Sequence, residues 1–258
     1  MGTLNCVIVG ANAAGPGGAP LRYAERDALV LCESLTSQRL YESVALHTHI
    51  GRHAASEILN SVIKTAQAAG PQDSIIFFYA GHGIREFDEE KGQQLLLAAG
   101  LGARVTGQDF AVPLAQVFDL LSGSHAKCVV ILLDCCFSGQ PGGRSVLGPK
   151  ILSMLASGRP LLQVPAPPLP GEGRVVLSAS RHDEPAREAR KYRHGIFSYA
   201  LLSELGQAER SERTDRIDVA SLYVDVRRTV LQKTNGSQCP TLSGGDQGAE
   251  LPTFRLRG

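Results

Sequence analysis

The stretch Lys127-Cys-Val-Val-Ile-Leu-Leu-Asp-Cys-Cys-Phe-Ser-Gly139 decides the fold. Its apolar run from Val129 to Leu133 has no polar alternation, which is typical of a central strand buried on both faces of a parallel sheet. An acid, two cysteines, a phenylalanine, a serine and a glycine follow directly. Open α/β sheets place their sites at the carboxyl ends of strands, so the end of this strand is a candidate site.

A second stretch, Asp73-Ser-Ile-Ile-Phe-Phe-Tyr-Ala-Gly-His-Gly83, has the same organisation. Its apolar run ends in a turn whose glycines flank a single ionisable side chain, His82. If the two strands are parallel neighbours, His82 meets Cys135 and Cys136 at one edge of the sheet. A nearby imidazole can lower the pKa of a thiol and later protonate a leaving amine, which indicates nucleophilic catalysis. The alternative is a buried core cysteine and an ordinary turn histidine.

The rest of the chain alternates between apolar strands and amphipathic helices. Strands are predicted over 4–10, 43–49, 95–99 and 175–180, with an edge strand over 252–256. Helical spacing of apolar residues predicts helices over 23–35, 54–69, 112–121, 197–205 and 218–233. The sequence therefore predicts one α/β domain over 1–258, with a mainly parallel sheet of about six strands and helices on both faces.

Composition and charge exclude several classes of protein. The net charge of +1 gives no reason to expect a nucleic-acid partner or an acidic membrane surface. No apolar run is long enough to cross a bilayer, and residues 1–6 lack the features of a signal peptide. The six cysteines lack zinc-ligand spacing, and the acids at 88–90 lack the alternation of a calcium loop. We therefore expect a reduced, cytoplasmic protein with no metal and no other cofactor.

Residues 141–173 differ in character from the segments on either side. Proline and glycine gather at both ends, as Pro141-Gly-Gly and Pro165-Ala-Pro-Pro-Leu-Pro-Gly171. This composition predicts an exposed, mobile connection of the kind that proteases cut. Four basic residues lie in or beside it: Arg144, Lys150, Arg159 and Arg174.

Two of these motifs resemble the signature motifs of an enzyme family. Phe78-Tyr-Ala-Gly-His-Gly83 and Asp134-Cys-Cys-Phe-Ser-Gly139 are similar to the histidine and cysteine motifs of the caspase-like cysteine peptidases, above all those of the metacaspase and bacterial orthocaspase branch. Other segments also resemble the family: Asp27-Ala28, Ser178–Glu188, Gly195–Ser198 and Gln238–Pro240. The resemblance implies a caspase-like three-layer sandwich, with a large-subunit-like part (1–140), a processing linker (141–173) and a small-subunit-like part (174–258).

The resemblance also implies a role for each site residue. The family nucleophile is the second residue after the acid, which is Cys136, and Cys135 holds a variable position. His82 corresponds to the general base and acid, and the backbone amides of Gly83 and Cys136 correspond to the oxyanion hole. The implied activity is that of a cysteine endopeptidase that forms an acyl-enzyme.

Substrate preference is implied by the acids that metacaspases place in their pocket, at positions matching Asp27 and Asp134. Two carboxylates favour Arg or Lys before the cleaved bond, and the planar fork of Arg suits them best. The alternative is structural, with Asp27 as a helix cap and Asp134 as part of a turn. Ala80 replaces the serine of the family motif, which removes one polar contact from the pocket.

The implied partners are protein substrates with a basic residue before the cleaved bond, and an upstream activating protease or regulator. Arg144, Lys150, Arg159 and Arg174 are then candidate self-cleavage sites. Bacterial relatives often serve stress or defence responses, which suggests such a setting. The calcium-binding acids of many metacaspases have no counterpart here, so a calcium requirement is not expected. The alternative from another class is a catalytically silent caspase fold that acts by binding a partner.

Overall fold

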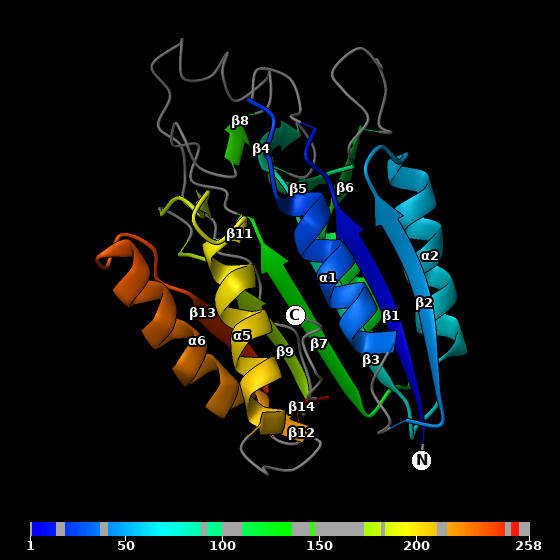
Figure 1. Ribbon diagram of the computed structural model, residues 1–258. Coiled ribbons are helices and arrows are strands. Elements are labelled where there is room, and N and C mark those ends of the chain that lie inside the picture. The colour runs from blue at the N-terminus through cyan, green and yellow to red at the C-terminus, as the bar shows by residue number, and fades with distance from the viewer. Residues whose placement is uncertain are drawn as a thin grey trace.

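A six-stranded sheet runs through the middle of the protein, in the order β13-β9-β7-β3-β1-β2 (Figure 1). The computed structural model describes residues 2–13, 19–36, 41–88, 92–99, 110–135, 145–147, 173–181, 184–210, 216–245 and 249–252. Strands β2, β1, β3, β7 and β9 are parallel neighbours, and β13 runs antiparallel to β9. The bounds are Thr3–Gly10 (β1), Ser43–Ile50 (β2), Ser74–Ala80 (β3), Cys128–Asp134 (β7), Arg174–Ser178 (β9) and Thr241–Gly245 (β13). The predicted fold class is confirmed.

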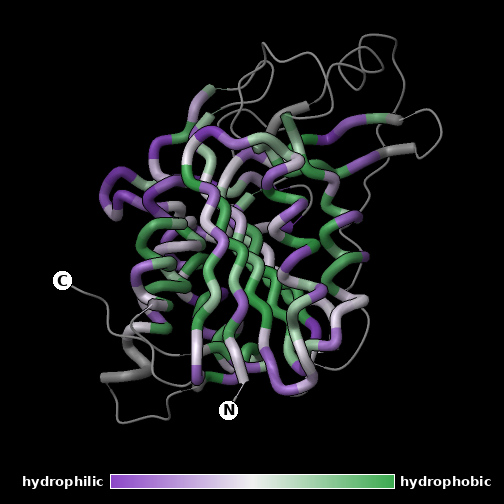
Figure 2. The backbone as a smooth tube through the Cα atoms, turned by 90° about the vertical axis from the view of Figure 1, so that its right-hand side faces the viewer, coloured by the Kyte–Doolittle hydropathy of each residue, from purple (hydrophilic) through white to green (hydrophobic). Residues whose placement is uncertain are grey.

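The two strands that carry the histidine and cysteine motifs lie at the centre of this sheet. Every residue of β3 and of β7 is buried, as their unbroken apolar runs predict. Strand β2, at the edge, mixes exposed and buried residues. In Figure 2 the hydrophobic colouring is concentrated on the strands in the middle of the fold.

Helices cover both faces of the sheet, as predicted. One face packs against α1 (Ala24–Thr36), α5 (Ile196–Arg210) and α6 (Val219–Thr234), which lie side by side in Figure 1. The other face packs against α2 (Ala55–Ala68) and α3 (Leu114–Ser122). The apolar face predicted for α1 is buried: Ala24, Ala28, Leu31 and Leu35 are each at most 1% exposed. Burying a leucine side chain stabilises the fold by about 1.5–3 kcal/mol.

Strand register brings the carboxyl ends of three strands to one level. Gly10 of β1 pairs with Ala80 of β3, and Ala80 pairs with Asp134 of β7. The Gly81 amide then donates to the Asp134 carbonyl oxygen at 3.3 Å. The turn that holds His82 is therefore next to the point where the cysteine motif begins.

Smaller sheets accompany the central sheet. Strand β4 (Gly83–Asp88) begins directly after His82 and joins β5 (Gly92–Ala98), β6 (Ala111–Pro113) and β8 (Ser145–Leu147) in the order β6-β5-β4-β8. Strands β10 (Glu188–Ala189) and β11 (His194–Gly195) form a hairpin just before α5, and β12 (Arg216–Asp218) pairs with β14 (Glu250–Pro252). Within the described residues, the structure contains no helix that is both long and apolar enough to cross a membrane.

The edge of the central sheet and the predicted linker differ from the sequence predictions. The sixth strand of the central sheet is β13. Of the predicted edge strand over 252–256, only residue 252 lies within the described residues, and it is the last residue of β14, which is not part of the central sheet. A Cβ at Gly244 of β13 would lie 2.3 Å from the Arg174 carbonyl oxygen, so this strand needs a small residue there and carries little apolar signal. Inside the predicted linker, Ser145–Leu147 form β8 beside β4, and 141–144 and 148–172 lie outside the described residues.

Candidate active site

His82 is carried by a turn that packs against Tyr79. The Tyr79 hydroxyl lies 2.8 Å from the carbonyl oxygen of His82 and 3.0 Å from that of Ala98, so it can donate to either. A Cβ at position 81 would lie 2.4 Å from the Tyr79 hydroxyl oxygen, so Gly81 makes room for this tyrosine. The Ala98 amide also donates to the His82 carbonyl oxygen, at 3.0 Å. The backbone of His82 is therefore fixed by its own strand and by β5.

The imidazole of His82 has a defined orientation. It is 2% exposed, and its Nε2 lies 2.9 Å from the carbonyl oxygen of Ala19. Because a carbonyl can only accept, Nε2 carries the proton, and in the neutral ring Nδ1 carries the lone pair. This tautomer is the one in which Nδ1 can take a proton from a nucleophile.

The cysteine motif begins beside this turn, at the end of β7. Cys135 is 3% exposed and packs in the core between the sheet and helices α2 and α3. A thiol packed in this core fits the variable position of the motif better than the nucleophile. Cys136, the predicted nucleophile, lies outside the described residues.

Asp27 is fully buried in the first turn of α1, and its carboxylate reaches across to the β10–β11 hairpin. Its Oδ1 lies 2.6 Å from Nδ1 of His194, and its Oδ2 accepts a hydrogen bond from the Gly195 amide at 3.0 Å. Both partners lie in β11, directly before α5. Asp27 therefore ties the start of α1 to the start of α5.

Asp134 is also fully buried and is bonded to the same helix start. Its Oδ2 accepts hydrogen bonds from the Ser198 amide at 3.2 Å and from the Ser198 hydroxyl at 2.5 Å. Amides and the helix dipole at an N-terminus favour ionised carboxylates. The N-terminus of α5 thus gathers the two acids that the resemblance places in one pocket, although they come from different elements.

Several residues that build this region were not singled out from the sequence. His194 and Ser198 are the side-chain partners of the two acids. Glu188 accepts the amides of Arg22 at 2.9 Å and Tyr23 at 2.8 Å, and so ties the β10–β11 hairpin to the residues just before α1. Ser198 and Glu188 lie in segments that resemble the family, and this resemblance is the only indication of them in the sequence. Nothing in the local pattern marks His194.

The four predicted self-cleavage sites have different positions. Arg174 is the first residue of β9, and its guanidinium donates to the carbonyl oxygens of Ser124 at 2.9 Å and Ala126 at 3.0 Å. A residue built into the central sheet in this way is poorly placed for cleavage. The remaining three, Arg144, Lys150 and Arg159, lie outside the described residues.

Comparison with known proteins agrees with this geometry. Residues 4–248 match the family described as the caspase domain. Among solved structures, the chain is similar to the crystal structure of a protein from Geobacter sulfurreducens, with a TM-score of 0.63, 16% sequence identity and full coverage of both chains. At this identity the likeness concerns the fold alone. None of the curated proteins matches the sequence. Together with the paired motifs at one edge of the sheet, the match over nearly the whole chain shows that this protein belongs to the caspase domain family of cysteine peptidases.

Proposed function

We propose that the chain is a cysteine endopeptidase in which His82 and Cys136 act as a dyad. The observation that carries the proposal is the bond from His82 Nε2 to the Ala19 carbonyl, which leaves Nδ1 as the base. Nδ1 takes the thiol proton of Cys136, and the thiolate attacks the carbonyl carbon of the substrate. The imidazolium then protonates the leaving amine as the C–N bond breaks, and water hydrolyses the acyl-enzyme.

Backbone amides supply the oxyanion hole in this proposal. Gly83 is buried at the start of β4, directly after His82, and Cys136 follows Asp134 and Cys135. Hydrogen bonds from the amides of Gly83 and Cys136 would stabilise the charge that develops on the carbonyl oxygen. In comparable enzymes one such donor contributes about 2.7–4 kcal/mol.

Cleavage after Arg or Lys is the proposed specificity. It is supported by the two buried carboxylates, Asp27 and Asp134, at the start of α5. A carboxylate can accept up to about four hydrogen bonds, so structural bonds to His194, Gly195 and Ser198 are compatible with a further role in binding a guanidinium. The structural alternative and the pocket are therefore not exclusive. This specificity also fits the resemblance to the metacaspase and orthocaspase branch.

Processing of the linker is the proposed route of regulation, alone or after an upstream signal in a stress or defence response. A tethered segment has a high effective concentration, so cleavage after Arg144, Lys150 or Arg159 would outpace cleavage of dilute substrates. The parts over 1–140 and 174–258 would stay together, because β9 pairs with β7 from Val129↔Arg174 to Leu133↔Ser178. A cytoplasmic location completes the proposal. It is compatible with the free thiols of Cys6, Cys32, Cys128 and Cys239.

Fluorogenic peptides that differ only in the residue before the cleaved bond test the proposed activity. Wild type should hydrolyse the Arg peptide best, the Lys peptide less well and the Asp peptide not at all, and an alkylating agent should stop hydrolysis. A silent binding module would hydrolyse none of them. Preference for the Asp peptide would contradict the specificity and leave the dyad standing.

Denaturing gels with native chromatography test the processing. Wild type should run as two fragments in the gel but as one species on the column, and Cys136→Ala should stay whole. Intact wild type that cleaves peptides at full rate would show that processing is not required.

A further inference from the structure

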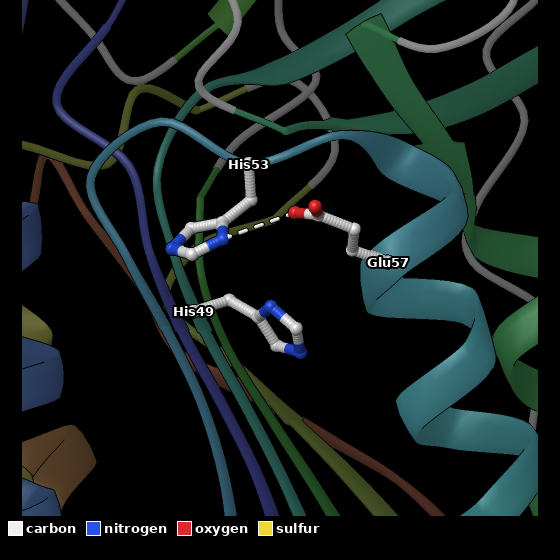
Figure 3. A group of neighbouring side chains, drawn as sticks. All are labelled: His49, His53 and Glu57. Atoms are coloured by element: carbon white, nitrogen blue, oxygen red, sulfur yellow. Dashed lines mark hydrogen bonds and ion pairs between the residues drawn. The ribbon is translucent and has the colours of Figure 1, made fainter.

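A second group of ionisable side chains lies at the carboxyl end of β2 (Figure 3). One potential ligand atom from each of His49, His53 and Glu57 lies within 4.8 Å of the other two. His49 is near the end of the strand, His53 is in the turn that follows, and Glu57 is in the first turn of α2. Three successive elements thus direct two imidazoles and a carboxylate to one place.

The hydrogen bonds of His49 fix its ring in one tautomer. The Ser61 hydroxyl donates its single proton to the Glu57 carbonyl oxygen at 3.2 Å, so its oxygen accepts from Nε2 of His49 at 2.9 Å. Nδ1 therefore carries the lone pair. Among the described residues this buried Nδ1 has no hydrogen-bond partner, although His49 is only 8% exposed. Burial, followed by the influence of His53, lowers the pKa of His49 to about 4, so the ring is neutral at pH 7.

The contacts of His53 favour a positive charge on its ring or beside it. Nε2 lies 3.2 Å from the Ile50 carbonyl oxygen, which can only accept, so Nε2 is the donor. Nδ1 lies 3.3 Å from Oε2 of Glu57, as the dashed line in Figure 3 marks. In a neutral ring this contact sets a lone pair against a carboxylate, which is repulsive. A proton on Nδ1, or a metal ion between the two atoms, makes it attractive.

The backbone under the cluster is held in place. His49 pairs with Val9 of β1, and the Gly51 amide donates to the Gly10 carbonyl oxygen at 2.9 Å. Gly51 has a φ of +94°, which a residue with a side chain rarely adopts. The His53 amide donates to the Ala99 carbonyl oxygen at 3.0 Å. Preorganised backbone of this kind favours a binding site over a chance meeting of side chains.

We propose that His49 Nδ1, His53 Nδ1 and a carboxylate oxygen of Glu57 bind a divalent transition-metal ion, for which Zn²⁺ is the best fit. Two imidazoles and a carboxylate form a common Zn²⁺ ligand set, with water in the fourth position. Ligand atoms around tetrahedral Zn²⁺ lie about 3.3 Å apart, so small side-chain rotations from the present spacing suffice.

Access and selectivity follow from the same residues. The side chains of His53 and Glu57 are 27% and 60% exposed, so solvent and an ion reach the open side of the cluster. Nitrogen ligands disfavour Ca²⁺ and Mg²⁺, which select oxygen. The bond from His49 to Ser61 is the outer contact that orients a ligating histidine and holds its tautomer.

Metal binding by the full chain tests the proposal, in a Cys136→Ala background that removes the proposed nucleophile as a ligand. Equilibrium dialysis with elemental analysis should give one Zn²⁺ per chain and no Ca²⁺ at this site. Adding His49→Ala or His53→Ala should weaken Zn²⁺ binding by more than about 100-fold, and Ser61→Ala by about 10–100-fold. Glu57→Gln keeps the size and the carbonyl acceptor of the side chain and should also weaken binding. His125→Ala, at an exposed histidine before β7, is the matched control and should bind as the background does.

Cobalt spectroscopy identifies the ligands. Bound Co²⁺ should give visible d–d bands without the near-ultraviolet charge-transfer band of a cobalt–sulfur bond. A charge-transfer band, equal binding by the His49→Ala and His125→Ala variants, or no binding by the background protein would overturn the proposal. If His49→Ala fails to fold, Glu57→Gln and Ser61→Ala carry the same test, because both are conservative changes at the edge of the cluster.

Discussion

His82 and His49 are two buried histidines at the carboxyl edge of one sheet, and each ring is oriented in the same way. In both, Nε2 donates to a fixed acceptor, the Ala19 carbonyl for His82 and the Ser61 hydroxyl for His49. In both, Nδ1 is left with the lone pair. The surroundings differ: the strand beside His82 leads into a cysteine motif, whereas His49 faces another imidazole and a carboxylate. The same tautomer can therefore serve proton transfer at one place and metal binding at the other.

Removing either member of the proposed dyad should have the largest effect, and that effect should be on catalysis alone. His82→Ala and Cys136→Ala should each lower kcat by about 10⁴–10⁶-fold, because the base and the nucleophile act as a unit. Zn²⁺ binding should survive His82→Ala. Kinetics with the Arg peptide and dialysis on the same samples measure both. Cys135→Ala should keep most activity, and an inactive Cys135→Ala beside an active Cys136→Ala would reverse the assignment.

The two acids at the start of α5 should give the next largest effect. Asp27→Asn and Asp134→Asn each remove a charge from the proposed pocket, and loss of one partner of a desolvated charge pair costs about 2–5 kcal/mol. We expect kcat/KM for the Arg peptide to fall by a corresponding factor. Asp73→Asn is the control, because Asp73 also accepts backbone amides, from Thr3 at 2.7 Å and Gly70 at 2.8 Å, but lies at the opposite end of β3.

A fall in kcat/KM for Asp73→Asn as large as that for Asp27→Asn would mean that all three acids act only through stability. An unchanged rate in Asp27→Asn would remove that acid from the pocket.

The sequence predicts the centre of the fold better than its edges. The runs in β3 and β7 are apolar throughout because both faces of each strand are covered, and this pattern needs no knowledge of the neighbours. Strand β13 consists mainly of small or polar residues, and it forms a strand because it pairs with β9, where Leu242 lies opposite Leu177. Pairing with a partner distant in sequence leaves no periodic signal of its own.

The candidate site shows the same division between motif and environment. His82, Asp27 and Asp134 are visible as motif residues, but the sequence does not show that α5 gathers both acids. His194 reaches Asp27 only because a hairpin packs against α1. The cluster of His49, His53 and Glu57 was missed because its residues lie on a strand, a turn and a helix, so neither a helical nor a strand period describes their spacing. The expectation of no metal came from cysteine and acidic patterns, which this cluster does not follow.

Buried thiols provide a further contrast with the activated thiol proposed at Cys136. Burial raises the pKa of Cys6 and of Cys128, so the folded protein keeps both protons after the unfolded chain has begun to lose them. The free energy of unfolding of Cys136→Ala should therefore fall as pH rises above about 8.5, by up to about 1.4 kcal/mol per pH unit for each thiol. Urea unfolding at pH 7.5 and 9.5 measures the slope, which Cys6→Val should reduce. Equal slopes with and without Cys6 would contradict the prediction.

The smallest effect should come from the hydroxyl that holds the His82 turn. Tyr79→Phe removes a bond to the carbonyl oxygens of His82 and Ala98, which costs about 1–3 kcal/mol of unfolding free energy when buried acceptors lose a partner. The rate should change little, since the Ala98 amide still holds the His82 carbonyl. Thermal unfolding and peptide kinetics of the same variant separate stability from activity. A loss of activity as large as that of His82→Ala would show that the hydroxyl itself takes part in catalysis.

Covalent labelling tests the central claim most directly. An irreversible peptidyl reagent with Arg at the reactive position is incubated with wild type, Cys135→Ala and Cys136→Ala, and the modified residue is located by peptide mass spectrometry. We predict one adduct, on Cys136, in wild type and in Cys135→Ala, and none in Cys136→Ala. An adduct on Cys135, or modification by an Asp reagent in place of the Arg reagent, would contradict the account.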